Sequence, residues 1–179
     1  TCPAPRDSGK GIRLLVRIWR VPDAGATGDL TARYLLPGLA ALQAAGQLSD
    51  RFQLTGVGRE EWGTGDFRHW AAAQLDRHGG RFPAAASKAL VSASSYHQAD
   101  VADIPSVAEV IAGDGPVAAY LALPPAVFPV AVSTLHDAGL PPGSRIVLEK
   151  PFGEDLDSAV ELNRLLAELV PEPAVFRVD

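Results

Sequence analysis

The sequence predicts an α/β fold with a doubly wound parallel sheet, whose two faces are covered by helices. Short apolar runs rich in β-forming residues alternate along the chain with longer segments whose apolar residues recur at helical spacing. This alternation is typical of βα units and a parallel sheet. The 179-residue chain shows no internal repeat and no dividing linker. We therefore expect residues 12–179 to form one domain, preceded at 1–11 by a disordered tail rich in Pro, Gly and Ser.

The first predicted strand and the first predicted helix flank a turn that contains glycines. Residues 12–19 form an apolar run that Arg13 and Arg17 interrupt, and residues 30–46 carry leucines at helical spacing. Gly46 is expected to end this helix. Pro37 lies inside it and is expected to kink or break it, because proline cannot donate the helical hydrogen bond.

The later elements continue the alternation. Residues 52–58 are a second apolar run, 66–80 are helical up to a pair of glycines, and 89–101 combine a strand with a polar tail. Further helices are predicted at 104–114, 126–139 and 155–169, and further strands at 117–123, 145–151 and 174–179. This order predicts a Rossmann-type, dinucleotide-binding domain, in which the tryptophans are expected to be packing residues.

Composition narrows the class of protein. The net charge of −5 at pH 7 argues against nucleic acid or an anionic membrane as a partner. No apolar run has the length of a membrane span, and the single cysteine, Cys2, can form no internal disulfide. The histidines show no metal-ligand spacing, so no metal is expected. These observations favour a soluble, cytoplasmic protein.

The turn "GATGDL" has the composition of a phosphate-binding turn. Glycines let the backbone approach a ligand closely, and the helix that follows offers free N–H groups to an anion. An ordinary βα turn would look the same, so both readings stay open at this point. The residues concerned are Gly25, Ala26, Thr27, Gly28, Asp29 and Leu30.

Two charged residues follow the second predicted strand. At this place in a doubly wound fold an acid binds the ribose 2′-hydroxyl of NAD, whereas an arginine accommodates the 2′-phosphate of NADP. Arg59 suits the phosphate because its planar guanidinium donates paired hydrogen bonds. Glu60 is ambiguous, since it could accept from a ribose hydroxyl and would repel a 2′-phosphate. Arg59 could also be a solvated residue at the end of a strand.

Lys150 ends the strand predicted at 145–151, within "LEKPFG". The carboxyl ends of parallel strands are where α/β folds bind ligands. Lys150 could therefore bind an anionic or hydroxyl-rich substrate, although a lysine at a strand end can also be purely structural. The bond to Pro151 is a candidate for the cis isomer.

Taken in order, these segments resemble the N-terminal coenzyme domain of glucose-6-phosphate dehydrogenase. The resemblance rests on "GATGDLT" (25–31), "LLPGL", "GVGR", "YLALPP" (120–125), "EKPFG" (149–153) and "FRVD" at the end of the chain. It extends from about residue 25 to residue 179. It implies oxidation of glucose 6-phosphate to 6-phosphogluconolactone with reduction of NADP, with NAD as a possible second coenzyme.

The resemblance also implies roles for individual residues. The turn from Gly25 to Leu30 would bind the pyrophosphate of NADP, with Thr27 and Arg59 near the 2′-phosphate. Asp100 and Val101 would lie near the adenine. Leu123, Pro124 and Pro125 would lie near the nicotinamide. Lys150 would contact both coenzyme and glucose 6-phosphate, and Asp179 would orient a catalytic histidine.

Other functions remain open from the sequence. The family's catalytic histidines, its substrate domain and most of its homo-oligomer interface lie beyond Asp179, so we expect this polypeptide alone not to turn over glucose 6-phosphate. The alternatives are a non-catalytic nucleotide-binding module, an inert truncated product, and a dehydrogenase acting on another sugar phosphate or polyol.

Overall fold

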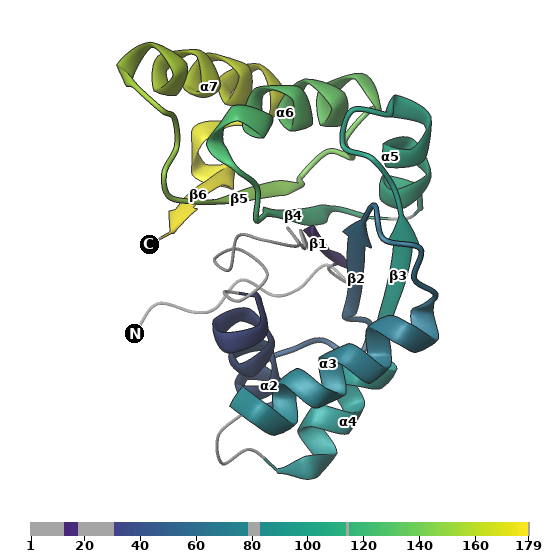
Figure 1. Ribbon diagram of the computed structural model, residues 1–179. Helices are drawn as coiled ribbons and strands as arrows, with labels where there is room; N and C mark the ends of the chain where they lie inside the picture. The colour runs from purple at the N-terminus through teal and green to yellow at the C-terminus, as the bar shows by residue number, and fades with distance from the viewer. Residues whose placement is uncertain (1–12, 18–30, 79–82, 114, 179) are drawn as a thin grey trace.

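The computed structural model describes residues 13–17, 31–78, 83–113 and 115–178. Within them a six-stranded parallel sheet has the strand order β3-β2-β1-β4-β5-β6 (Figure 1). The strands are β1 (Arg13–Arg17), β2 (Gln53–Gly58), β3 (Ser94–Gln98), β4 (Val117–Leu121), β5 (Arg145–Glu149) and β6 (Val175–Val178). The order is that of a doubly wound nucleotide-binding fold, and the predicted fold class is confirmed.

Helices connect the strands. The α-helices are α2 (Leu36–Ala44), α3 (Thr64–His78), α4 (Ala84–Ser92), α5 (Ile104–Ile111), α6 (Phe128–Asp137) and α7 (Leu156–Leu169). A π-helical turn, η1 (Thr31–Leu35), precedes α2, and two 3₁₀ turns, η2 (Pro125–Val127) and η3 (Glu172–Ala174), precede α6 and β6. None of the helices in these ranges is long and apolar enough to span a bilayer.

The helices form two layers, one on each face of the sheet. Figure 1 shows α2, α3 and α4 on one side and α5, α6 and α7 on the other. Side chains alternate between the two sides along β4, where Ala119 and Leu121 join the core under α5–α7 and Tyr120 packs on the core under α2–α4. This alternation is the ordinary pleat of a strand that is buried on both faces.

The strand β1 lies at the centre of the sheet and pairs with both β2 and β4. Its Leu14 lies opposite Leu54 on one side and opposite Ala118 on the other. From β1 the chain proceeds outward through β2 to β3, and it then crosses to β4 on the other side of β1 and continues to β6. The winding direction therefore changes at the place in the sheet between β1 and β4. Open α/β sheets bind their ligands at such a switch point, outside the carboxyl ends of the strands.

The first helical segment changes from π-helical to α-helical hydrogen bonding beside Pro37 and continues without a gap. The chain runs through the π-helical turn η1 and becomes α-helical at Leu36, so Pro37 lies in the first turn of α2, where no helical hydrogen bond is required of its nitrogen. Gly46 follows the helix with a φ of 66°, a left-handed conformation that favours glycine.

One helix was not predicted, and part of one predicted strand is wrong. Residues 89–92, expected to begin a strand, belong to helix α4, and the strand β3 starts only at Ser94. The alanine-rich start of α4 has high helix propensity, and its Ala86 and Leu90, one turn apart, are both buried. Residues 89–92 alone form a short apolar run, and such a run does not distinguish a strand from a buried helix.

An aromatic cluster joins α3 to the carboxyl half of β2 and β3. It consists of Trp62, Phe67, Trp70 and Tyr96, whose ring centroids lie 5.7–6.1 Å apart in four contacting pairs. Gly56 of β2 makes room for it, because a Cβ there would lie 2.8 Å from the Phe67 ring. The expectation that Trp62 and Trp70 are packing residues is confirmed.

Candidate functional site

The predicted site residues that the structure describes lie at the carboxyl ends of four different strands. Arg59 follows β2, Asp100 and Val101 follow β3, Leu123 to Pro125 follow β4, and Lys150 follows β5. Because the strands are parallel, these positions share one edge of the sheet, which we call the carboxyl edge. The turn from Gly25 to Leu30, including Thr27, and the terminal Asp179 lie outside the described residues.

Arg59 and Asp100 are brought together although they are far apart in the sequence. Arg59 Nη1 lies 3.8 Å from Asp100 Oδ2, and the two side chains are 55% and 45% exposed. Gln98 Nε2 donates to the Arg59 carbonyl oxygen at 3.2 Å, and Asp100 Oδ1 accepts from the backbone N–H of Ala102 at 3.0 Å. These hydrogen bonds fix the backbone of the loops after β2 and β3, while the Arg59 guanidinium is accessible to a ligand from solvent.

The segment after β4 carries an uncapped helix start. Leu123 is buried, and Pro124 and Pro125 are partly buried. Among the described residues, neither η2 nor α6 has a side-chain hydrogen bond at its N-cap, and the first turn of α6 contains no acid. By contrast, Asp103 caps α5 and Asp155 caps α7.

Lys150 is exposed at the junction of β5 and β6. Its backbone N–H donates to the Val178 carbonyl oxygen at 3.3 Å, and the bond to Pro151 is cis. The following turn packs tightly on α7, since a Cβ at Gly153 would lie 2.7 Å from the nitrogen of Ala159. The backbone that carries Lys150 is thus fixed on both sides of the residue.

Sequence reasoning missed a pair of side chains that joins β4 to β5 beside Lys150. The Tyr120 hydroxyl donates a hydrogen bond to Glu149 Oε1. Burial raises the pKa of Tyr120 above its ordinary value, and the hydrogen bond and charge of Glu149 raise it further. Tyr120 is therefore a neutral hydrogen-bond donor at physiological pH. In the sequence, a tyrosine in an apolar run and an acid next to a lysine gave no sign that they would meet.

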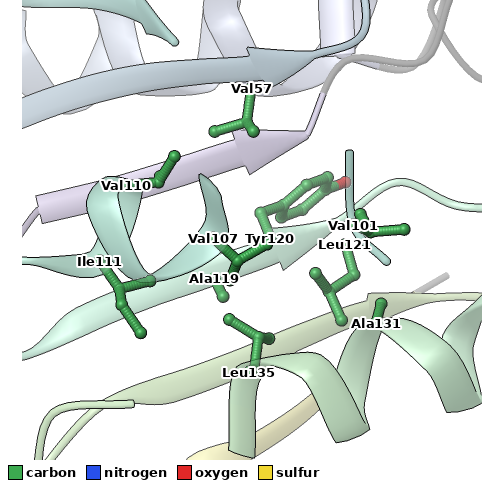
Figure 2. Close-up of a pocket in the computed structure, with 10 residues that line it drawn as sticks. All are labelled: Val57, Val101, Val107, Val110, Ile111, Ala119, Tyr120, Leu121, Ala131 and Leu135. Carbon is green, nitrogen blue, oxygen red and sulfur yellow. The ribbon is translucent and has the colours of Figure 1, made fainter. Parts of the chain in front are cut away.

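A small apolar cavity opens between the sheet and the two helices α5 and α6. Its volume is about 50 Å³, and Figure 2 shows its walls. Val57, Val101 and Leu121 come from the carboxyl ends of β2, β3 and β4, and the deeper wall is formed mainly by α5. The lining is almost wholly hydrocarbon, so the cavity suits an apolar group better than water.

Metal chemistry finds no support in these parts of the chain. Across the described ranges no group of three or more His, Cys, Asp or Glu side chains is placed to hold a metal ion. His97, at the end of β3, lies instead 3.7 Å from the Glu109 carboxylate of α5.

Comparison with known proteins gives one consistent match. Residues 24–179 match the family model for the glucose-6-phosphate dehydrogenase NAD binding domain. Over 162 residues the chain is 36% identical to glucose-6-phosphate 1-dehydrogenase of Zymomonas mobilis, covering 87% of this chain and 33% of that protein. It is also 36% identical, with the same coverage, to glucose-6-phosphate 1-dehydrogenase 2 of Mycobacterium bovis.

Solved structures show the same relationship. The crystal structure of glucose-6-phosphate 1-dehydrogenase from Mycobacterium avium superimposes with a TM-score of 0.79 at 30% identity, over 94% of this chain and 36% of that one. A glucose-6-phosphate dehydrogenase in complex with glucose 6-phosphate gives a TM-score of 0.78 at 27% identity, over 95% and 36% of the two chains. The chain thus spans about a third of the length of these relatives, and it belongs to the glucose-6-phosphate dehydrogenase family, in the NAD binding domain of that family.

Proposed function

We propose that this chain binds NADP along the carboxyl edge of its sheet and is the coenzyme domain of a glucose-6-phosphate dehydrogenase. The complete enzyme oxidises glucose 6-phosphate to 6-phosphogluconolactone and reduces NADP. The observation that carries the proposal is the exposed Arg59 at the carboxyl end of β2, the position that reads the ribose in this fold. Membership of the family supports it independently.

The proposed contacts follow the coenzyme from its adenine to its nicotinamide. Arg59, together with Thr27, binds the 2′-phosphate, and Asp100 and Val101 flank the adenine. The turn from Gly25 to Leu30 binds the pyrophosphate, and Leu123, Pro124 and Pro125 lie beside the nicotinamide.

Several features of the described residues fit such a ligand. The apolar cavity beside Val101 offers hydrocarbon contacts at the adenine end. The start of α6, next to Pro124, presents a positive helix end that suits the phosphate groups of the coenzyme. Asp100 pairs with Arg59, which keeps the guanidinium at the edge.

Contact with both the coenzyme and the substrate is proposed for Lys150. Its exposed ammonium group, carried on a fixed backbone, can donate to a phosphate or hydroxyl of glucose 6-phosphate. Asp179 is proposed to orient the histidine that removes the proton from the C1 hydroxyl in the complete enzyme. NADP supplies the hydride acceptor. A cytoplasmic location is part of the proposal and accords with a chain whose one cysteine can form no internal disulfide.

Calorimetric titration of the 179-residue chain with NADP and with NAD tests the proposal. We expect saturable binding of NADP, and we expect Arg59→Ala to raise the Kd for NADP at least about tenfold, a loss of about 1.4 kcal/mol. The Kd for NAD, which lacks the 2′-phosphate, should stay nearly constant. Arg145→Ala is the matched control, because Arg145 is an exposed arginine at the opposite, amino end of β5.

The outcomes separate the proposal from its alternatives. Binding of neither coenzyme would contradict it and favour an inert product. Equal losses of NADP and NAD affinity in Arg59→Ala would remove Arg59 from the 2′-phosphate site.

A further inference from the structure

An acid next to the arginine poses a problem for NADP recognition. Glu60 follows Arg59 at the carboxyl end of β2, where a carboxylate favours the 2′-hydroxyl of NAD and repels the 2′-phosphate of NADP. The coenzyme preference of this site therefore depends on which of the two side chains faces the ribose.

The structure gives Glu60 a specific partner. The Tyr96 hydroxyl lies 3.2 Å from Glu60 Oε2 and 3.1 Å from the Glu60 carbonyl oxygen. A single hydroxyl proton serves these two acceptors, so Tyr96 ties the side chain and the main chain of Glu60 to the same point. Both residues are partly buried, which strengthens a hydrogen bond to a carboxylate.

Tyr96 is itself rigidly held. Its ring packs against Trp62 and Phe67, with centroid distances of 5.8 and 5.9 Å, and its backbone N–H donates to Thr64 Oγ1 at 3.2 Å. Trp62 stands only two residues beyond Glu60, so the aromatic cluster also fixes the loop that carries the acid. The hydroxyl is thus presented to Glu60 from a platform that cannot easily shift.

Arg59 is engaged differently. Its guanidinium lies 3.8 Å from Asp100, with more than half of its side chain exposed. Gln98 holds its carbonyl oxygen, on the same strand as Tyr96 and two residues further along. Two neighbouring residues of one loop are therefore held by β3 at separate points, Arg59 through its carbonyl oxygen and Glu60 through both its carboxylate and its carbonyl oxygen.

We propose that Tyr96 is a specificity-determining positioning residue, whose hydroxyl holds the Glu60 carboxylate against the aromatic cluster and off the ribose, so that Arg59 selects NADP over NAD. The inference rests on the proposed coenzyme function and adds the residue that resolves the conflict between Arg59 and Glu60.

The test is a double-mutant cycle read by coenzyme titration. Tyr96→Phe keeps the ring and its packing and removes only the hydroxyl. We expect it to raise the Kd for NADP about tenfold, equivalent to about 1.4 kcal/mol, and to leave the Kd for NAD unchanged or lower. The same substitution in a Glu60→Gln background should leave the preference for NADP unaltered, because no carboxylate is left to restrain.

Ser95→Ala is the matched control. Ser95 precedes Tyr96, and its hydroxyl bonds to Thr55 across the same two strands at 3.1 Å, so this variant removes a β2–β3 hydrogen bond without touching Glu60. It should change thermal stability but not the ratio of the two Kd values.

Each result decides the matter. An unchanged ratio in Tyr96→Phe, or a loss of preference that persists in the Glu60→Gln background, overturns the inference while NADP binding by the unaltered chain still supports the proposed function. If the unaltered chain binds both coenzymes equally, this inference alone is overturned, and if it binds neither, the proposed function is overturned as well; both results are seen before any variant is made.

Discussion

The two edges of the sheet lie next to helix ends of opposite partial charge. At the amino edge, where strands begin and helices end, arginines meet carbonyl oxygens. Arg13 donates to the carbonyls of Ile111 and Ala112 at the end of α5. Arg68 donates to the carbonyl of Ser92, the last residue of α4, and to that of Ser94, the first residue of β3. At the carboxyl edge, where helices begin, Asp103 and Asp155 cap α5 and α7.

The difference lies in how completely the helix ends are neutralised. Helix termini carry partial charges, negative at the C-terminus and positive at the N-terminus. At the amino edge Arg13 and Arg68 supply compensating positive charge to the ends of α5 and α4. At the carboxyl edge α6, next to the switch point, has no side-chain cap from the part of the chain that the structure describes. The contacts at the amino edge therefore stabilise the fold, whereas the positive start of α6 would suit the anionic coenzyme that we propose for the carboxyl edge.

Arg13→Ala tests the amino edge and should have the largest effect on stability. It removes both donors from the end of α5, and we expect the free energy of unfolding to fall by roughly 1–3 kcal/mol. Urea denaturation gives this value. Arg145→Ala, at the start of β5, is the control and should change stability by less than about 0.5 kcal/mol. NADP affinity should not change in either variant. A weaker affinity in Arg13→Ala would contradict the separation of stabilising contacts at the amino edge from ligand binding at the carboxyl edge.

Tyr120→Phe tests the carboxyl edge with an intermediate effect. The variant keeps the ring and takes the hydrogen bond away from Glu149, so the free energy of unfolding should fall by about 1 kcal/mol or less. NADP affinity should fall as well, because Glu149 directly precedes Lys150. Urea denaturation and calorimetry measure the two changes. If the free energy of unfolding falls while NADP affinity stays the same, Tyr120 has a purely structural role, as the arginines of the amino edge do.

Asp155→Asn gives the smallest effect and a distinctive dependence on pH. Hydrogen bonds from the side chain and backbone of Ser158 lower the pKa of the Asp155 carboxyl. A lowered pKa contributes stability that is present above the unfolded-state value of about 3.9 and is lost as the pH falls through the folded-state value. Urea midpoints should therefore differ slightly between the variant and the unaltered chain at pH 7 and converge below pH 4. A constant difference down to pH 2 would contradict this origin.

Local patterns in the sequence predicted most of the elements, and long-range contacts explain what was missed. The alternation of apolar runs and helices sufficed for the sheet, and the glycine at position 46 sufficed for the C-terminal end of α2. Arg13 was read as an interruption of a strand, because its partners on α5 lie nearly a hundred residues away. The pairing of Tyr120 with Glu149 was hidden because the two residues lie 29 positions apart on different strands.

The candidate site likewise contains residues that the sequence could identify and contacts that it could not. Arg59 and Lys150 could be named because a strand end is visible in the sequence. The sequence could not decide between Arg59 and Glu60, since the contact that restrains Glu60 comes from Tyr96 on the neighbouring strand. Helix α4 was missed because a short apolar window does not distinguish a buried strand from a buried helix.

The central position of β1 has a consequence for synthesis on the ribosome. The strand pairs on both sides, yet Arg13 and the residue that it caps at the end of α5 are 99 positions apart, and β4 comes later still. At roughly 5–20 residues per second, about 5–20 s pass before that side of β1 can be covered. During this interval a nascent chain exposes the edge of its most central strand, which makes early pairing with β2 and shielding by chaperones important for yield.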